Sequence, residues 1–317
     1  MPSPGSLPPR RPILDVAGLV LCRGGVASLD DVSLRQQRGT VLAVVGPNGA
    51  GKTALLDCLT GLRHPSRGSA HFWPSHGRDD RPWTSPATGP RALHVPPAGL
   101  ESAWRGDAAG AGLVAARTPV ELVGRRPPEV ARLGIARTFA CPRPFEDLTV
   151  LDNVLVAVEA RPRRGDWWAR FERLRRRGRR GPARMARTIA WELLDVVGLA
   201  GRAGEPAAGL PDGARRRLEI ARALGTGPSL LLLDEPAAGA GAVERAWLAE
   251  LVRRLRARGV SVLLAEHEPR LALAIADLVV LLDAGTVVAT GAPAEIRAGL
   301  AVGQPGGRHR AQSVAET

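Results

Sequence analysis

Three apolar runs mark the chain, and each is followed by a short polar or glycine-containing stretch. They lie at residues 41–45 (VLAVV), 229–233 (SLLLL) and 261–265 (SVLLA). Continuous apolar runs of this length, without the alternation of a half-exposed strand, predict strands that are buried on both faces. Because such strands belong to parallel sheets covered by helices, the pattern predicts an α/β fold.

Helical and hairpin patterns lie between and after these runs. Residues 54–60 have helical spacing and end at Gly61, a residue type typical of the position just after a helix. A second helix, rich in arginine, is predicted at 215–224. Apolar residues at 278–282 and 287–289 flank the turn sequence DAGT and predict a β-hairpin.

The composition is that of a globular protein. The chain has 317 residues, of which 44% are hydrophobic and 24% charged, and its net charge is +13. No run approaches the roughly 18 apolar residues that a membrane span needs, and residues 1–12 lack the apolar segment of a secretory signal. Three widely separated cysteines argue against a disulfide framework. We therefore expect a soluble protein of the cytoplasm.

A single lysine marks the candidate site. Lys52 is the one lysine among 44 basic residues, and lysine offers a compact ammonium where arginine offers a wide planar fork. It lies in a complete G-x-x-x-x-G-K-[ST] phosphate loop between a predicted strand and helix. The loop consists of Gly46, Pro47, Asn48, Gly49, Ala50, Gly51, Lys52 and Thr53. Its N–H groups and Lys52 would hold the phosphates of ATP, and the Thr53 hydroxyl would ligate Mg²⁺.

The other two apolar runs end in acidic and histidine residues. Asp234 and Glu235 follow the leucine run, and His267 follows the run at 261–265. Ligands of α/β sheets bind at the carboxyl ends of the strands, so we expect these side chains to converge on the phosphates. Asp234 would hold Mg²⁺, Glu235 would polarise the attacking water as general base, and His267 would contact the γ-phosphate.

The order of these motifs resembles the ATPase subunit of an ABC transporter. The resemblance covers residues 12–72 and 119–297 and includes the phosphate loop, the arginine-rich helix, the Asp-Glu-Pro segment and the strand before His267. Three further segments are similar to the ATP-binding subunits of branched-chain or hydrophobic amino acid importers: 131–139 (ARLGIARTF), 148–157 (LTVLDNVLVA) and 231–239 (LLLDEPAAG).

That resemblance implies a P-loop NTPase (RecA-like) core with an antiparallel β-subdomain and a helical subdomain. It also implies ATP and Mg²⁺, a second ATPase subunit facing this one, two membrane permease subunits and, indirectly, a solute-binding protein. The chain would be peripheral, at the cytoplasmic face of the inner or plasma membrane. We expect the ATPase domain at 12–297, with a Pro/Gly-rich insertion at 73–118, the helical subdomain at 142–225, and tails at 1–11 and 298–317.

The chain departs from the family at the signature segment, which binds the partner's nucleotide. That segment usually reads Leu-Ser-Gly-Gly-Gln, and residues 210–214 read LPDGA here. Pro211 has neither a hydroxyl nor an N–H group to donate. Asp212 adds a negative charge where a triphosphate would dock.

Three other positions also depart from the family. Ala140 stands where a glutamine bridges metal, water and membrane subunit, residues 239–242 (GAGA) lack a polar or acidic residue, and Arg23 stands where an aromatic ring stacks on adenine. A guanidinium plane can still stack on a base. The groups that hold ATP within the chain are intact, whereas those that face the partner or membrane are eroded. We therefore expect an asymmetric heterodimer rather than a homodimer, with little ATP hydrolysis by the isolated chain.

A strongly basic run leaves other functions open. Residues 161–187 contain twelve arginines and two acidic residues, with Trp167, Trp168 and Phe171 among them. Such a run is typical of a solvated helix face, of a contact with an anionic membrane surface, or of nucleic-acid binding. The alternatives are an ATP-binding regulatory subunit with little or no hydrolysis, and a non-transport ABC ATPase that contacts nucleic acid. The second lacks support from a second ATPase domain or a long coiled coil.

Overall fold

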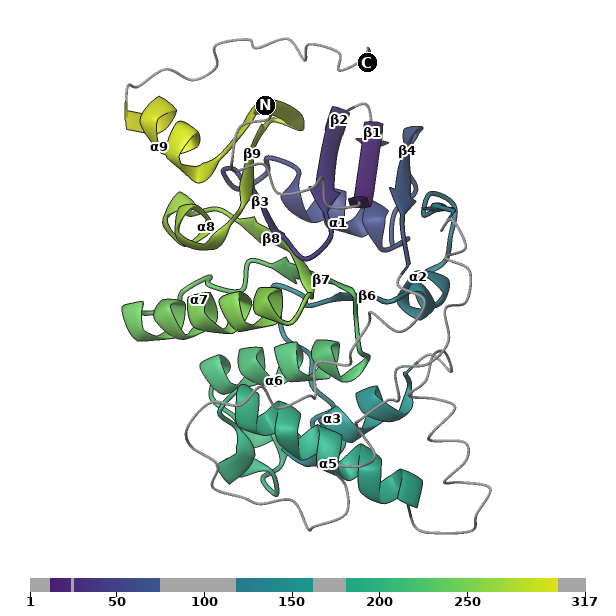
Figure 1. Cartoon of the computed structure of the whole chain (residues 1–317), viewed down its shortest axis with the longest axis vertical. Helices are drawn as coiled ribbons and strands as arrows, with labels where there is room; N and C mark the ends of the chain where they lie inside the picture. Colours follow the sequence, from purple (N-terminus) through teal and green to yellow (C-terminus); the bar gives the residue numbers. More distant parts are fainter. Residues whose placement is uncertain (1–11, 24–25, 75–117, 162–180, 302–317) are drawn as a thin grey trace, which may run out of the picture.

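The chain folds into two sheets and a block of helices (Figure 1). The larger sheet has the strand order β10-β9-β3-β8-β7-β6 and the smaller has the order β2-β1-β4-β5. The predictions for the insertion and for the basic run fall largely on residues 75–117 and 162–180, outside the described residues. The computed structural model describes residues 12–23, 26–74, 118–161 and 181–301.

The larger sheet contains the three strands that the apolar runs predict. Every residue of β3, β7 and β8 is buried. The neighbours β9-β3, β3-β8, β8-β7 and β7-β6 pair in parallel, and β9 and β10 form the predicted antiparallel hairpin. This arrangement confirms the α/β fold class. The strands are β3 (Val41–Val45), β6 (Ile135–Arg137), β7 (Leu230–Asp234), β8 (Ser261–Glu266), β9 (Leu278–Asp283) and β10 (Thr286–Gly291).

The smaller sheet is antiparallel throughout. Helix α1 (Lys52–Leu59) shares one hydrophobic core with it, because Leu55, Leu56 and Leu59 pack in the same buried cluster as the apolar residues of β1 and β2. Helix α2 (Pro127–Leu133) precedes β6. The strands of the smaller sheet are β1 (Pro12–Arg23), β2 (Val26–Gln37), β4 (Arg67–Phe72) and β5 (Val120–Glu121).

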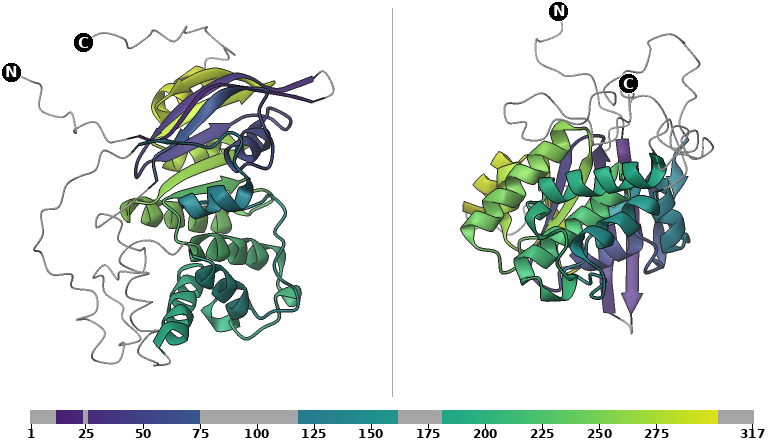
Figure 2. Two further views of the ribbon diagram at one scale, coloured as in Figure 1. Left: turned by 90° about the vertical axis from the view of Figure 1, so that its right-hand side faces the viewer. Right: turned by 90° about the horizontal axis from the view of Figure 1, so that it is seen from below.

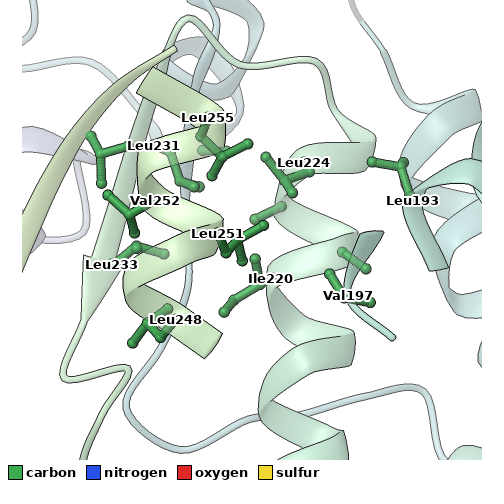
Figure 3. Packing of buried hydrophobic residues seen from close by; sticks show 14 of the residues in the cluster. Leu193, Val197, Ile220, Leu224, Leu231, Leu233, Leu248, Leu251, Val252 and Leu255 are labelled. Carbon is green, nitrogen blue, oxygen red and sulfur yellow. The ribbon is translucent and has the colours of Figure 1, made fainter. Parts of the chain in front are cut away.

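A helical block of α3 (Val150–Glu159), α5 (Gly181–Val196) and α6 (Asp212–Gly225) lies below the sheets in Figure 1, and Figure 2 shows the same order from the side. Helix α7 (Ala242–Ala257) joins this block to the sheet. Figure 3 shows Ile220 and Leu224 of α6 facing Leu251 of α7, with Leu231 and Leu233 of β7 on the opposite side of α7. The signature-bearing helix is therefore anchored to the sheet through α7.

The last helices complete the described chain. Helix α8 (Pro269–Ile275) follows β8, and α9 (Pro293–Ala301) follows β10. Residue 297, the expected end of the domain, lies within α9, and the neighbouring Ile296 is buried in the core. Among the helices of the described ranges, none is long and apolar enough to cross a membrane.

Candidate functional site

The phosphate loop connects the carboxyl end of β3 to the first turn of α1. A Cβ at Gly46 would collide with the carbonyl oxygen of Leu282, and one at Gly51 would lie 2.5 Å from the carbonyl oxygen of Ser28. Gly51 also has a φ of 103°, in the left-handed region that favours glycine. The first bond of the helix runs from the Leu55 N–H to the Gly51 carbonyl at 2.9 Å, so the preceding N–H groups lie at the open helix end. A loop of this kind binds anions.

The Lys52 ammonium lies at the centre of that loop. Its side chain is 3% exposed, and Nζ lies 3.4 Å from Glu235 Oε1. Nζ donates hydrogen bonds of 2.9 Å to the carbonyl oxygens of Gly46 and Pro47. The positive charge and the helix N-terminus therefore act on the same point, which fits a polyphosphate.

Asp234 ends β7 directly beside the phosphate loop. Its side chain is 2% exposed, and Oδ1 accepts a hydrogen bond of 3.2 Å from the Thr53 hydroxyl. Mg²⁺ prefers oxygen ligands and is usually held by one or two carboxylates together with substrate phosphates. Within the described part of the chain, no group of three or more His, Cys, Asp or Glu residues forms a metal cage. Thr53 and Asp234 therefore fit a Mg²⁺ ion that is held jointly with a nucleotide.

Glu235 adopts an unusual backbone conformation at the end of the same strand. Its φ is 45°, a region that costs a residue other than glycine about 1–3 kcal/mol and that recurs at functional sites. Its N–H donates to the Ala265 carbonyl of β8 at 2.9 Å, and its carboxylate faces Lys52. The bend carries the side chain from β7 toward the phosphate loop.

His267 follows β8 and lies next to a buried acid that the sequence did not single out. The His267 side chain is 38% exposed, and its Nδ1 is 3.9 Å from Glu266 Oε2. Glu266 is 1% exposed, and its Oε1 accepts a hydrogen bond of 2.9 Å from the Ala237 N–H. Burial raises the pKa of Glu266 to about 7, partly offset by the Ala237 N–H and His267. Its backbone carbonyl also accepts from the Gly46 N–H at 3.2 Å, so Glu266 connects three parts of the site.

Arg137 is a second site residue that sequence reasoning missed. It ends β6, its side chain is 4% exposed, and its Nη2 lies 2.9 Å from Asp234 Oδ2. Arg137 lies in the segment 131–139 that resembles importer subunits, but nothing in that segment marks the arginine as a site residue.

The positions that we expect to face a partner lie on other elements. Pro211 is the residue before α6, where no side-chain hydrogen bond caps the helix, and Asp212 is its first residue. Both are exposed, as is Ala140, which follows the end of β6. Gly239 and Gly241 are also exposed, in the loop between β7 and α7. The structure thus gathers the phosphate-binding candidates at one sheet edge and leaves the altered positions on the surface.

Comparison with known proteins finds a family that matches more than half of the chain and relatives that align with 90% of it. The ABC transporter family matches residues 29–89 and 118–238. The high-affinity branched-chain amino acid transport ATP-binding protein LivG of Salmonella typhimurium is 32% identical over 90% of this chain and 94% of its own length. The corresponding protein BraF of Pseudomonas aeruginosa is 33% identical over the same shares. The ADP conformation of MJ1267, an ATP-binding cassette of an ABC transporter, has a TM-score of 0.65 at 24% identity, covering 92% of this chain and 95% of its own.

Proposed function

The chain belongs to the ABC transporter family of ATPases, and on that basis we propose that it is the ATP-binding subunit of a branched-chain or hydrophobic amino acid importer. The names of LivG and BraF support that substrate class. The observation that carries the nucleotide-binding role is the convergence of Lys52, Thr53 and Asp234 at one sheet edge, with Thr53 and Asp234 3.2 Å apart.

Each residue at the sheet edge has a chemical role in this proposal. Lys52 and the loop N–H groups bind the phosphates, and Thr53 and Asp234 hold Mg²⁺, which neutralises charge on the β- and γ-phosphates. Glu235 accepts the proton of the attacking water, and His267 helps to orient that water. Because Glu235 Oε1 lies 3.4 Å from Lys52 Nζ, an entering phosphate competes with Glu235 for the ammonium and frees the carboxylate to act as a base.

The signature segment supports an asymmetric pair. The loss of one donor to a transition state lowers a rate by roughly 10²- to 10³-fold, and Pro211 removes such a donor. A like charge at about 4 Å adds on the order of 4 kcal/mol at an effective dielectric of 20, before Mg²⁺ reduces it, and Asp212 adds that charge. In this proposal a second ATPase subunit supplies an intact signature to the nucleotide on this chain. Two permease subunits and a solute-binding protein complete a transporter at the cytoplasmic membrane face.

A regulatory subunit that binds ATP with little or no hydrolysis is the second candidate. It is favoured by Ala140, an exposed methyl group where the family has a glutamine that relays hydrogen bonds. The two candidates share the nucleotide site and differ in turnover when the partner ATPase is present.

Calorimetry and an ATPase assay on the same purified chain test the proposal. We expect heat of binding from Mg·ATP and little turnover by the isolated chain, with turnover gained when the partner ATPase is added. Absence of binding would contradict the nucleotide site. Fast turnover by the isolated chain that Glu235→Gln abolishes would contradict the asymmetric pair. Binding without turnover in the complete complex would favour the regulatory subunit.

A further inference from the structure

A buried arginine joins the end of α1 to the metal-binding carboxylate. Arg137 Nη2 lies 2.9 Å from Asp234 Oδ2, and Nη1 lies 2.7 Å from Asp57 Oδ1. Nη1 also donates to the Thr60 hydroxyl at 3.2 Å. With 4% of its side chain exposed, Arg137 makes these contacts away from solvent.

The second oxygen of each carboxylate is also engaged. Asp234 Oδ1 accepts from the Thr53 hydroxyl at 3.2 Å, and Asp57 Oδ2 pairs with Arg63 Nε at 2.9 Å. Positive and negative groups therefore alternate from Arg63 through Asp57 and Arg137 to Asp234, which accepts from the neutral Thr53 hydroxyl. Thr53 lies in the first turn of α1 and Asp57 in its second half, so the network fixes both ends of this helix against β7.

Arginine suits this position better than lysine does. Its planar fork can hold two carboxylates in separate directions at once, whereas an ammonium is a single point of charge. The guanidinium carbon also lies 5.0 Å from the centre of the Phe139 ring, and this contact helps to fix the orientation of the guanidinium plane. The contacts thus fix the rotation of Asp234 as well as neutralise its charge.

We propose that Arg137 is a positioning residue of the magnesium site: by holding Asp234 Oδ2, it keeps Oδ1 beside Thr53, where Mg²⁺ binds. This inference rests on the proposed function, because it assumes that Thr53 and Asp234 hold Mg²⁺ together with ATP. Partners that hydrogen-bond a metal-binding carboxylate typically change metal affinity by roughly 10- to 100-fold when they are replaced.

The test is a titration of a fluorescent ATP analogue, once in EDTA and once over a range of magnesium concentrations. Arg137→Lys keeps the charge but cannot bridge Asp57 and Asp234. We expect its metal-free affinity to stay within about twofold of the wild type and its apparent magnesium affinity to fall about tenfold or more. Asp57→Asn removes the anchor of Arg137 and leaves Asp234 in place, so we expect a smaller loss in the same direction.

Arg217→Lys is the matched control. Arg217 binds the Glu244 carboxylate through two nitrogens at 2.9 and 2.6 Å and lies 4.3 Å from the Trp247 ring, in an arginine–carboxylate pair between α6 and α7 that is more exposed than Arg137 and lies on other elements. We expect Arg217→Lys and Arg137→Lys each to lower the melting temperature, because each loses contacts of a planar guanidinium, and we expect Arg217→Lys to leave magnesium affinity unchanged.

The outcomes separate this inference from the function on which it rests. A wild-type chain that binds no Mg·ATP overturns the proposed function and this inference together. A wild-type chain that binds Mg·ATP, with magnesium affinity unchanged or increased in both Arg137→Lys and Asp57→Asn, overturns the positioning role alone. A loss of the same size in Arg217→Lys would assign the effect to general destabilisation and would also overturn it.

Discussion

The carboxyl edge of the six-stranded sheet and the N-terminus of α6 are the two regions that contact nucleotides in our proposal, and this chain builds them differently. At the sheet edge, Lys52, Thr53 and Asp234 are joined by hydrogen bonds and ion pairs to Glu235 and Arg137. At the start of α6, Pro211 and Asp212 of the signature segment are exposed, Gly213 and Ala214 are half-buried, and Leu210 is buried. The charged groups of the first region are paired with one another, whereas Pro211 and Asp212 of the second region face solvent.

At the N-terminus of α6, residues that suit the start of a helix are not residues that suit the binding of a phosphate. Pro211 has a φ of −65°, which the proline ring adopts without strain, and Asp212 places a negative charge in the first turn, where the helix dipole favours it. Both residues suit the start of a helix. Pro211 offers a phosphate no hydrogen-bond donor, and Asp212 repels it with a like charge. The fold therefore tolerates at α6 the two residues that, in our proposal, impair its role toward a partner.

Repair of the signature should have the largest effect. We expect Pro211→Ser, Asp212→Gly and Ala214→Gln together to raise the turnover of the purified chain by roughly 10²- to 10³-fold, because a donor is restored and a like charge removed. A coupled assay of phosphate release measures the change. The same repair combined with Glu235→Gln is the control and should stay inactive. Equal turnover before and after the repair would show that the altered signature residues do not lower the rate of hydrolysis.

Loss of the lysine should abolish the sheet-edge function. We expect Lys52→Ala to weaken Mg·ATP binding by on the order of 100-fold, since about 3 kcal/mol is the upper range for a hydrogen bond to a charged group. Lys52→Arg should lose nearly as much, because the side chain is 3% exposed and a wider head does not fit between the loop carbonyls. Calorimetry measures both affinities. Full binding by Lys52→Arg would show that charge alone is required.

The buried Glu266 should make folding stability depend on pH. Its pKa is about 7 in the folded chain against an ordinary 4.5, so the folded state binds the proton more tightly. The contribution of this proton to the free energy of unfolding is therefore fully present below pH 4.5 and is lost as the pH rises through 7. We expect the free energy of unfolding to fall by roughly 2 kcal/mol between pH 5 and 8. Glu266→Gln keeps an acceptor for the Ala237 N–H and should flatten this dependence in urea unfolding. If the free energies of unfolding of the wild type and Glu266→Gln changed with pH in the same way, the pH dependence would not come from Glu266.

Restoring the glutamine after Phe139 should have the smallest effect. Ala140→Gln adds one polar side chain at an exposed position, and we expect it to raise turnover in the signature-repaired chain about tenfold, the worth of one hydrogen bond to a charged group. The same assay of phosphate release measures it. Ala140→Met, which has a similar size and no amide, is the control. A gain with methionine as large as with glutamine would contradict a polar role.

The sequence predicted the local elements of the site and not their connections. The strand, loop and helix around Lys52 follow from apolar runs and a spaced glycine motif, and the structure has them as β3 and α1. The expected helix start at 54 was two residues late, because α1 begins at Lys52 inside the loop. Local pattern marks such elements because their residues are neighbours in the chain.

The contacts of Arg137 and Glu266 were beyond reach of the sequence. Arg137 lies 80 positions from Asp57 and 97 from Asp234, and it meets them only because β6 lies beside β7 in the sheet. In a chain so rich in arginine, no composition signal identifies a buried one. The strand order that brings these residues together depends on packing between distant segments.

A mixing experiment tests the asymmetry most directly. One protein carries the repaired signature together with Lys52→Ala. We expect it to bind ATP poorly but to complete the nucleotide site of another chain. It is mixed with the wild-type chain. The account predicts that neither protein alone hydrolyses ATP appreciably and that the mixture does, with the activity lost when the wild-type partner carries Glu235→Gln. Fast hydrolysis by the wild-type chain alone, with no gain on mixing, would contradict it.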